Sequence, residues 1–245
     1  GWLTSINNSG LSNDGGSTNN DSDDLFGMNL VYNQETINIG GTNTQSLYDG
    51  RISAVKWTSN NQKEPPKERG YNYYYDSKAR FQESKFAAKT SGSFTDEAGY
   101  YNTQTPQYDE NGNIKQLKRY GKVSGSATLI DDLTYGYGSN GNQLTTVEDA
   151  ASASVSKFGY PNATTGIDPE LQYDKNGNLK SDLNAAITSV TYNYLNLPEK
   201  VVIDIANTSV DNSIEYTYDD SGYLVKKGYK KGTTAVRTIH YDHGL

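Results

Sequence analysis

Short runs of alternating apolar and polar residues recur along the chain and predict β-strands. Tyr71, Tyr73 and Tyr75 would share one face of a strand, because successive side chains of a strand point to opposite faces. The same alternation groups Leu133, Tyr135 and Tyr137, then Val190, Tyr192 and Tyr194, then Val201, Ile203 and Ile205, and then Ile214, Tyr216 and Tyr218. Asn, Asp and Gly follow these runs, which is typical of hairpins. The pattern predicts an all-β protein.

One segment comes close to a helical pattern. In Ser77–Gly92 the two phenylalanines, Phe81 and Phe86, are five residues apart, which fits a period of 3.6 poorly. We therefore expect a pair of strands joined by a turn there, or at most a short helix.

A short phrase repeats between the strands. It reads YDENGNI from Tyr108, YDKNGNL from Tyr173 and YDDSGYL from Tyr218. Asp at the first turn position and Gly at the fourth predict a type I turn, with the Gly in the left-handed region completing a bulged hairpin. Tyr173 would then close the incoming strand, and Leu179 would start the outgoing one.

Looser copies extend the series at irregular intervals. Residues 137–141 lack the Asp, residues 48–52 and 241–244 are shortened, and residues 192–198 are the most degenerate copy. Ala79 stands where Gly is expected in residues 75–81, so we expect a different turn there. The positions that define the repeat are Tyr108, Asp109, Gly112, Tyr137, Gly141, Tyr173, Asp174, Gly177, Leu179, Tyr218, Asp219, Gly222, Tyr241 and Asp242. Repeats of this size predict a spiralling antiparallel sheet, in which one hairpin cannot bury its own face.

Two polar stretches interrupt the series. Residues 8–24 and 60–70 are predicted to be surface loops, and the repeats continue across the second. We therefore predict one structural unit over residues 1–245, with no separate catalytic domain.

Composition narrows the possible partners. Hydrophobic residues make up 33% of the chain, and 21 tyrosines supply rings for a thin, wet core. The net charge of -7 argues against a nucleic-acid partner, and the lack of Cys excludes disulfides and thiolate chemistry. No apolar stretch is long enough to span a membrane, and the first residues lack a signal-peptide pattern.

The repeated phrase resembles the motif of the Rhs/YD-repeat family, which is roughly Tyr-Asp-x-x-Gly-Arg/Asn-Leu. The likeness covers nearly the whole chain and is strongest from Gly99 onward. The resemblance implies a β-ribbon that spirals into a hollow shell around a C-terminal toxin in bacterial proteins, with related shells in toxin complexes and teneurins. The family's autoproteolytic core is not recognised here, because Asp168-Pro169 falls between repeats. The implied partners are the rest of the same polypeptide, the enclosed toxin domain and components of a secretion machinery.

Several chemical readings compete with the structural one. A calcium loop needs Gly at position 6 and Glu at position 12, but Gly177 is at position 4 after Asp174 and Ala185 is at position 12. His240 and His243 would point to different faces of a strand, as would Asp131 and Asp132, so neither pair forms a metal or glycosidase site. No GxSxG motif is present.

The resemblance implies a structural shell segment of a secreted or cell-surface bacterial protein, and the absent motifs lead us to expect no enzyme activity, no cofactor and no metal. The alternative is an extracellular adhesin or carbohydrate-binding repeat, since exposed Tyr and Trp rings such as Trp2 and Trp57 can stack on sugars. Open sheet edges would make this piece associate with itself.

Overall fold

Antiparallel strands make up nearly all of the regular structure. The computed structural model describes residues 1–11, 24–60, 65–139, 141–162, 166–204 and 212–242. Contacts divide the chain into two compact units, residues 1–133 with 150–159, and residues 134–149 with 160–245. The all-β antiparallel prediction is confirmed. The prediction of one structural unit over residues 1–245 stays a prediction.

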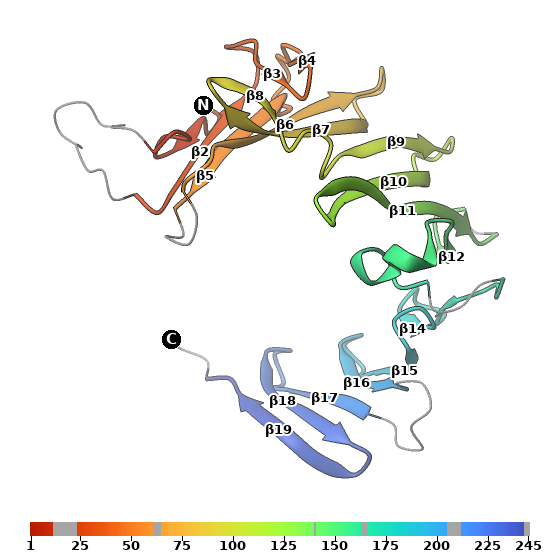
Figure 1. Cartoon of the computed structure of the whole chain (residues 1–245). Coiled ribbons are helices and arrows are strands. Elements are labelled where there is room, and N and C mark those ends of the chain that lie inside the picture. Colours follow the sequence, from red (N-terminus) through yellow and green to blue (C-terminus); the bar gives the residue numbers. More distant parts are fainter. Residues whose placement is uncertain (12–23, 61–64, 140, 163–165, 205–211, 243–245) are drawn as a thin grey trace. The chain divides into compact units, whose positions relative to one another are not determined.

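The first unit is a sheet whose neighbouring strands mostly follow one another in the chain, in the order β1-β2-β5-β6-β7-β9-β10-β11 (Figure 1). A short 3-10 helix, η1 (Ala153–Phe158), also belongs to it. The strands are β1 (Ser5–Ile6), β2 (Phe26–Val31), β3 (Asn38–Ile39), β4 (Thr42–Asn43), β5 (Ala54–Ser59), β6 (Arg69–Tyr75), β7 (Phe81–Thr90), β8 (Ser93–Asp96), β9 (Thr103–Tyr108), β10 (Ile114–Val123) and β11 (Ser126–Tyr137).

Strands β3, β4 and β8 cover one face of this sheet and enclose a small core (Figure 1). Ile39 and Phe94 form the single parallel bridge between β3 and β8. They pack so closely over Gly70 that a Cβ there would lie 2.8 Å from Ile39 Cδ1. The other buried members of the core are Val31, Ala54 and Ala87.

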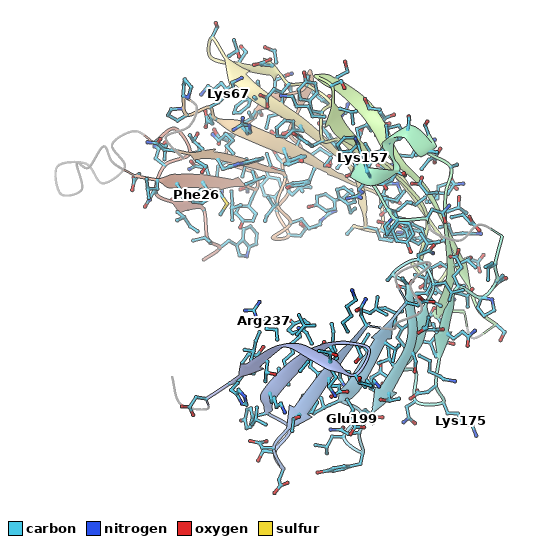
Figure 2. The ribbon with its side chains drawn as sticks, turned by 60° about the horizontal axis from the view of Figure 1, so that its bottom comes forward. Phe26, Lys67, Lys157, Lys175, Glu199 and Arg237 are labelled. Atoms are coloured by element: carbon cyan, nitrogen blue, oxygen red, sulfur yellow. The ribbon has the colours of Figure 1, made fainter. Side chains whose placement is uncertain are left out.

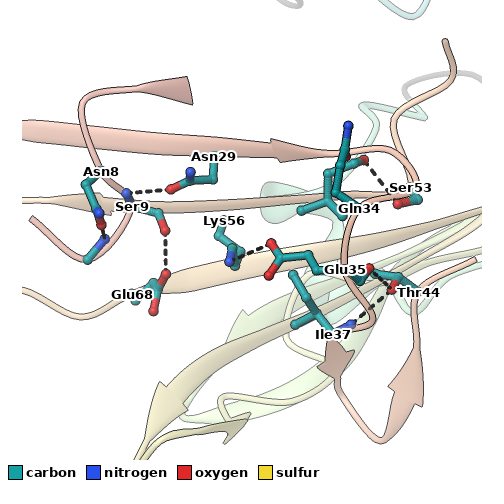
Figure 3. Close-up of polar contacts among 12 residues, drawn as sticks. Asn8, Ser9, Asn29, Gln34, Glu35, Ile37, Thr44, Ser53, Lys56 and Glu68 are labelled. Carbon is teal, nitrogen blue, oxygen red and sulfur yellow. Dashed lines mark hydrogen bonds and ion pairs between the residues drawn. The ribbon is translucent and has the colours of Figure 1, made fainter. Parts of the chain in front are cut away.

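Polar contacts fasten the N-terminal segments to this sheet (Figure 3). The Ser9 amide donates to Asn29 Oδ1 at 2.7 Å, and its hydroxyl donates to Glu68 at 2.6 Å. Lys56 pairs with Glu35 at 2.9 Å. Residues 8–24 are predicted to be a surface loop, but Ser9 near its start is buried, with only 3% of its surface exposed. Residues 12–23 of this loop lie outside the described part.

Aromatic side chains line the opposite face of β5, β6 and β7. Trp57 stacks on Tyr71 with ring centroids 5.7 Å apart, and Tyr71 stacks on Tyr73 at 5.9 Å. Phe86, 2% exposed, packs edge-on against Tyr101 at 4.9 Å. Burial raises the pKa of Tyr71 to about 12. The predicted shared face of Tyr71 and Tyr73 is confirmed.

The second unit contains the end of β11, strand β12 and a seven-stranded antiparallel meander in chain order (Figure 1). Its strands are β12 (Leu144–Asp149), β13 (Leu171–Tyr173), β14 (Leu179–Asp182), β15 (Ile187–Tyr192), β16 (Pro198–Ile203), β17 (Asn212–Tyr218), β18 (Leu224–Lys231) and β19 (Thr234–His240). In its described part the buried apolar residues are Val147 and Leu171, and the buried polar ones include Glu170. The described part of this unit therefore has a smaller apolar core than the first unit.

Two placements differ from the prediction. Residues 77–92 form a turn and the whole of β7, and the strands β6 and β8 that pair with it lie outside this segment, so the expected pair of strands within it is wrong. Tyr194 does not continue the face of Val190 and Tyr192, because β15 ends at Tyr192 and the Tyr194 side chain is 82% exposed in the following turn. Ile205 lies outside the described residues, as do residues 61–64 of the second predicted loop.

Candidate functional site

The three best copies of the repeated phrase adopt one turn. At each, the Gly amide donates to the carbonyl of the Asp three residues earlier, at 3.0 to 3.2 Å. Gly112, Gly177 and Gly222 have φ angles of 88°, 85° and 84°. The hydrogen bond and the positive φ match the predicted turn. Tyr173 ends β13 and Leu179 begins β14, also as predicted.

The Asp carboxylate holds each turn together from inside. Asp174 Oδ1 accepts from the amides of Asn176 at 2.8 Å and Asn178 at 2.9 Å. Its Oδ2 accepts from Asn178 Nδ2 at 3.0 Å. These donors hold the pKa of Asp174 below its usual value, with the Asn178 side chain contributing most. At Asp109 the Asn113 side chain lowers the pKa in the same way.

The turn after Tyr75 keeps the same geometry without glycine, so the expectation of a different turn is wrong. Ala79 has a φ of 65°, and its amide donates to the Asp76 carbonyl at 2.9 Å. The left-handed conformation costs Ala about 1 to 2 kcal/mol. The Arg80 amide donates to Asp76 Oδ1 at 2.9 Å, and its guanidinium contacts Oδ2 at 2.6 Å. These contacts offset the strain, and the Arg80 side chain also holds the pKa of Asp76 below its usual value.

Residues 192–198 also form this turn, although they are the least regular copy. Asn193 Oδ1 accepts from the amides of Leu195 at 2.9 Å and Leu197 at 3.0 Å. Asn196 takes the glycine position with a φ of 57°. A neutral amide oxygen therefore replaces the carboxylate without changing the turn.

The remaining copies differ more. In the Tyr137 copy, Gly141 has a φ of 83° and donates to the Gly138 carbonyl, but Gly138 pairs with Gln143, one residue further on than in the other turns. Gly50 has a φ of 87° beside the Asp49–Arg51 ion pair. Tyr241 and Asp242 are exposed residues after β19, and the rest of that copy lies outside the described chain.

Tyrosine hydroxyls connect each of several turns to the preceding one. The hydroxyl donates to a backbone carbonyl just after the preceding turn, at or near the start of the outgoing strand. The pairs are Tyr75 to Ile52 at 2.8 Å, Tyr108 to Phe81 at 2.5 Å, Tyr192 to Leu179 at 2.8 Å and Tyr218 to Pro198 at 2.9 Å. We call these four bonds the hydroxyl links. Burial raises the pKa of all four tyrosines.

Side chains add contacts between consecutive turns. The Arg51 guanidinium lies over the Tyr75 ring at 4.8 Å, and Arg80 lies over the Tyr108 ring at 4.3 Å. These arrangements are cation–π contacts within the first unit. The residue that holds the Asp of one turn thus also covers the tyrosine of the next.

In the second unit, asparagines replace these arginines. Asn196 Oδ1 accepts from Asn176 Nδ2 at 2.9 Å and Asn178 Nδ2 at 3.1 Å, which ties two successive turn tips together. The Lys175 side chain at the tip projects away from the strands (Figure 2). The turns therefore contact one another but leave their outermost side chains in water.

The contacts between turns were missed by sequence reasoning. The Arg or Asn directly after the turn glycine was a visible signal, because it recurs at residues 80, 113 and 178. The hydroxyl links left no local signal, since their partners are 13 to 27 residues apart in the chain.

Other candidate chemistry is occupied by structural contacts. Asp131 is fully buried against Arg119 at 2.6 Å, whereas Asp132 pairs with Lys118 at 3.0 Å. The two carboxylates thus have separate partners, in line with their predicted opposite faces. In the described part of the chain no three His, Cys, Asp or Glu side chains gather as metal ligands, and no helix is long and apolar enough to cross a membrane.

No protein-family model matches the chain, and no curated protein matches it either.

Proposed function

We propose that this chain is a wall segment of an Rhs/YD-repeat shell, with a structural role in enclosing a polypeptide cargo and helping to deliver it. The observation that carries the proposal is the set of hydroxyl links. Each of these tyrosine hydroxyls finds its hydrogen-bond acceptor in a neighbouring hairpin. A single hairpin alone would therefore leave this hydroxyl without its partner. A sheet built in this way grows by adding hairpins in chain order.

Such a wall acts by exclusion. Strands paired through their backbones resist proteases, and they keep an enclosed domain away from its substrate. The turn carboxylates support this role, because their lone pairs accept from amides of their own turns. On this proposal the remaining partners are the rest of the same polypeptide and a cargo domain, in a secreted or surface-exposed bacterial protein.

Protease protection tests the enclosure. The longest natural polypeptide that contains residues 1–245 would be purified and digested, and the fragments would be identified by mass spectrometry. We expect a segment outside residues 1–245 to survive digestion. Replacing all four linking tyrosines (residues 75, 108, 192 and 218) with Phe should speed its cleavage, since each lost link weakens the wall.

The matched control replaces Tyr48 and Tyr194 with Phe. Both are exposed, at 76% and 82%, so their loss should leave protection unchanged. Cleavage of all flanking segments at the rate of an unfolded chain would reject the enclosing role, as would a natural polypeptide that has no residues beyond these.

Strand β19 supplies a second test, of the open edge. In the described chain β19 pairs only with β18, and most of its residues are exposed. The isolated 245-residue chain should associate through this edge, which light scattering measures. Thr238→Pro, which removes a backbone donor from the open side of β19, should reduce association. A monomer at all concentrations would contradict the open-edge expectation.

A further inference from the structure

A polar pocket of about 400 Å³ lies in the first unit, beside the turn at residues 75–81. Its lining residues are Gln45, Tyr74, Gln82, Glu83 and Gln104. They come from the segment after β4 and from β6, β7 and β9. The volume lies within the range of pockets that bind small molecules.

A β-bulge explains why two sequence neighbours line the same pocket. Tyr74 pairs with Glu83 and Tyr75 pairs with Phe81, so Gln82 is the extra residue of β7. In a regular strand Gln82 and Glu83 would point to opposite faces. The same bulge accompanies the turns after Tyr173, Tyr192 and Tyr218, and here it redirects one side chain toward the pocket.

The Tyr74 ring is held in place by contacts outside the pocket. Its hydroxyl donates to the Asn43 carbonyl at 3.0 Å and accepts from Asn72 Nδ2 at 3.4 Å. Lys85 Nζ lies 5.7 Å from the ring centroid and donates to Thr42 Oγ1 at 2.8 Å. The hydroxyl is thus already paired, and the ring itself is what Tyr74 offers to a ligand.

The three glutamine amides are unused. Within the described residues, the side chains of Gln45, Gln82 and Gln104 have no hydrogen-bond partner in the protein. Glu83 lies 4.0 Å from Lys85, so its charge is partly compensated. The pocket therefore presents several unpaired donors and acceptors beside an aromatic ring, with little net charge.

We propose that this pocket binds a neutral sugar residue. Each sugar hydroxyl both donates and accepts, which suits an amide that carries a carbonyl acceptor and two N–H donors. The apolar C–H face of a pyranose packs on an aromatic ring. A phosphate or carboxylate ligand fits less well, because Lys85, the cation over the Tyr74 ring, is already engaged by Thr42 and Glu83. This inference does not depend on the enclosing role, since a wall segment and an adhesin could both carry the pocket.

Ligand-observed NMR on the full 245-residue chain tests the proposal. The probes are the methyl glycosides of mannose, galactose and N-acetylglucosamine, with cyclohexanol as a ring that has a single hydroxyl. We expect at least one glycoside to bind saturably, with a dissociation constant on the order of 1 mM, and cyclohexanol to bind more weakly. Gln82→Leu and Gln104→Leu keep the side-chain volume and remove the amide, so each should weaken binding about tenfold.

Gln172→Leu is the matched control, because Gln172 is an exposed glutamine of β13 in the other unit. It should leave binding unchanged, and circular dichroism should show that all variants remain folded. Three results would overturn the proposal: no saturable binding by any glycoside, unchanged binding in the Gln82→Leu/Gln104→Leu double variant, or cyclohexanol binding as tightly as the glycosides. None of the three would affect the protease-protection result.

Discussion

The two units use the same turn but stabilise their sheets differently. The first buries apolar side chains such as Val31, Ile39 and Phe86 between its sheet and the covering strands β3, β4 and β8, or within its aromatic face. In the described part of the second, only Val147 and Leu171 are buried apolar residues. The second sheet therefore depends more on backbone pairing, turn contacts and hydroxyl links. One repeated turn can thus serve both a layered and a thin sheet.

Removing a core ring should have the largest effect, and only in the first unit. Phe86→Ala deletes a ring that contacts Trp57, Tyr71 and Tyr101, so it should lower the unfolding free energy by about 3 to 5 kcal/mol. Trp fluorescence during urea unfolding measures this, because both tryptophans belong to the first unit.

The matched deletion in the second unit is Ile214→Ala. Ile214 is only half-buried in β17, so we expect a loss of about 1 kcal/mol, followed by circular dichroism. Equal losses for Phe86→Ala and Ile214→Ala would show that the second unit has a core comparable to that of the first.

Exchanging the glycine position between units should have effects of opposite sign. Gly177→Ala places a Cβ at a φ of 85° and should cost about 1 to 2 kcal/mol in the second unit. Ala79→Gly relieves the strain at a φ of 65° and should stabilise the first unit by a smaller amount, because Gly loses more chain entropy on folding. Thermal unfolding of each variant measures both. Stabilisation by Gly177→Ala would contradict the shared turn geometry.

These turns also show how much of the structure the sequence predicts. Asp109, Gly112, Asp174 and Gly177 were assigned correctly because turn chemistry is local: a short side chain caps amides two and four residues on, and Gly accepts positive φ. The expectation at Ala79 is wrong because the Arg80 guanidinium, by contacting Asp76, offsets the strain of the positive φ angle. A rule based on residue propensities does not include such a contact. Local rules therefore predict the positions of the turns. They are less accurate about which residues a turn can accommodate.

Contacts between distant segments were beyond local reasoning. Nothing near Tyr192 indicates that its hydroxyl reaches Leu179, and nothing near Gln82 indicates that it lines a pocket, since both depend on strand register. The covering strands β3, β4 and β8 are two to four residues long, too short for an alternating pattern to identify. Register and covering layers are set by tertiary packing.

Removing single hydroxyl links should have a moderate effect that differs between the units. Tyr192→Phe and Tyr108→Phe each delete one hydrogen bond to a carbonyl, worth about 0.5 to 1.5 kcal/mol. The loss should reduce cooperativity more in the second unit, which has less core to compensate. Urea unfolding followed by circular dichroism measures it, and Tyr194→Phe, at an exposed ring, is the control. If Tyr194→Phe were as destabilising as Tyr192→Phe, the hydroxyl links would have no particular role in stability.

The smallest effect at neutral pH is expected from neutralising one turn carboxylate. Asp174→Asn should keep the turn, because Asn193 already forms the same turn with an amide oxygen. The pKa of Asp174 is held below its usual value, so its contribution to stability is present above that usual value and is lost as pH falls through the lower folded pKa. The difference between wild type and Asp174→Asn in the unfolding free energy should therefore shrink in acid. An unchanged difference from neutral pH down to about pH 2 would show that the carboxylate charge contributes nothing to this turn.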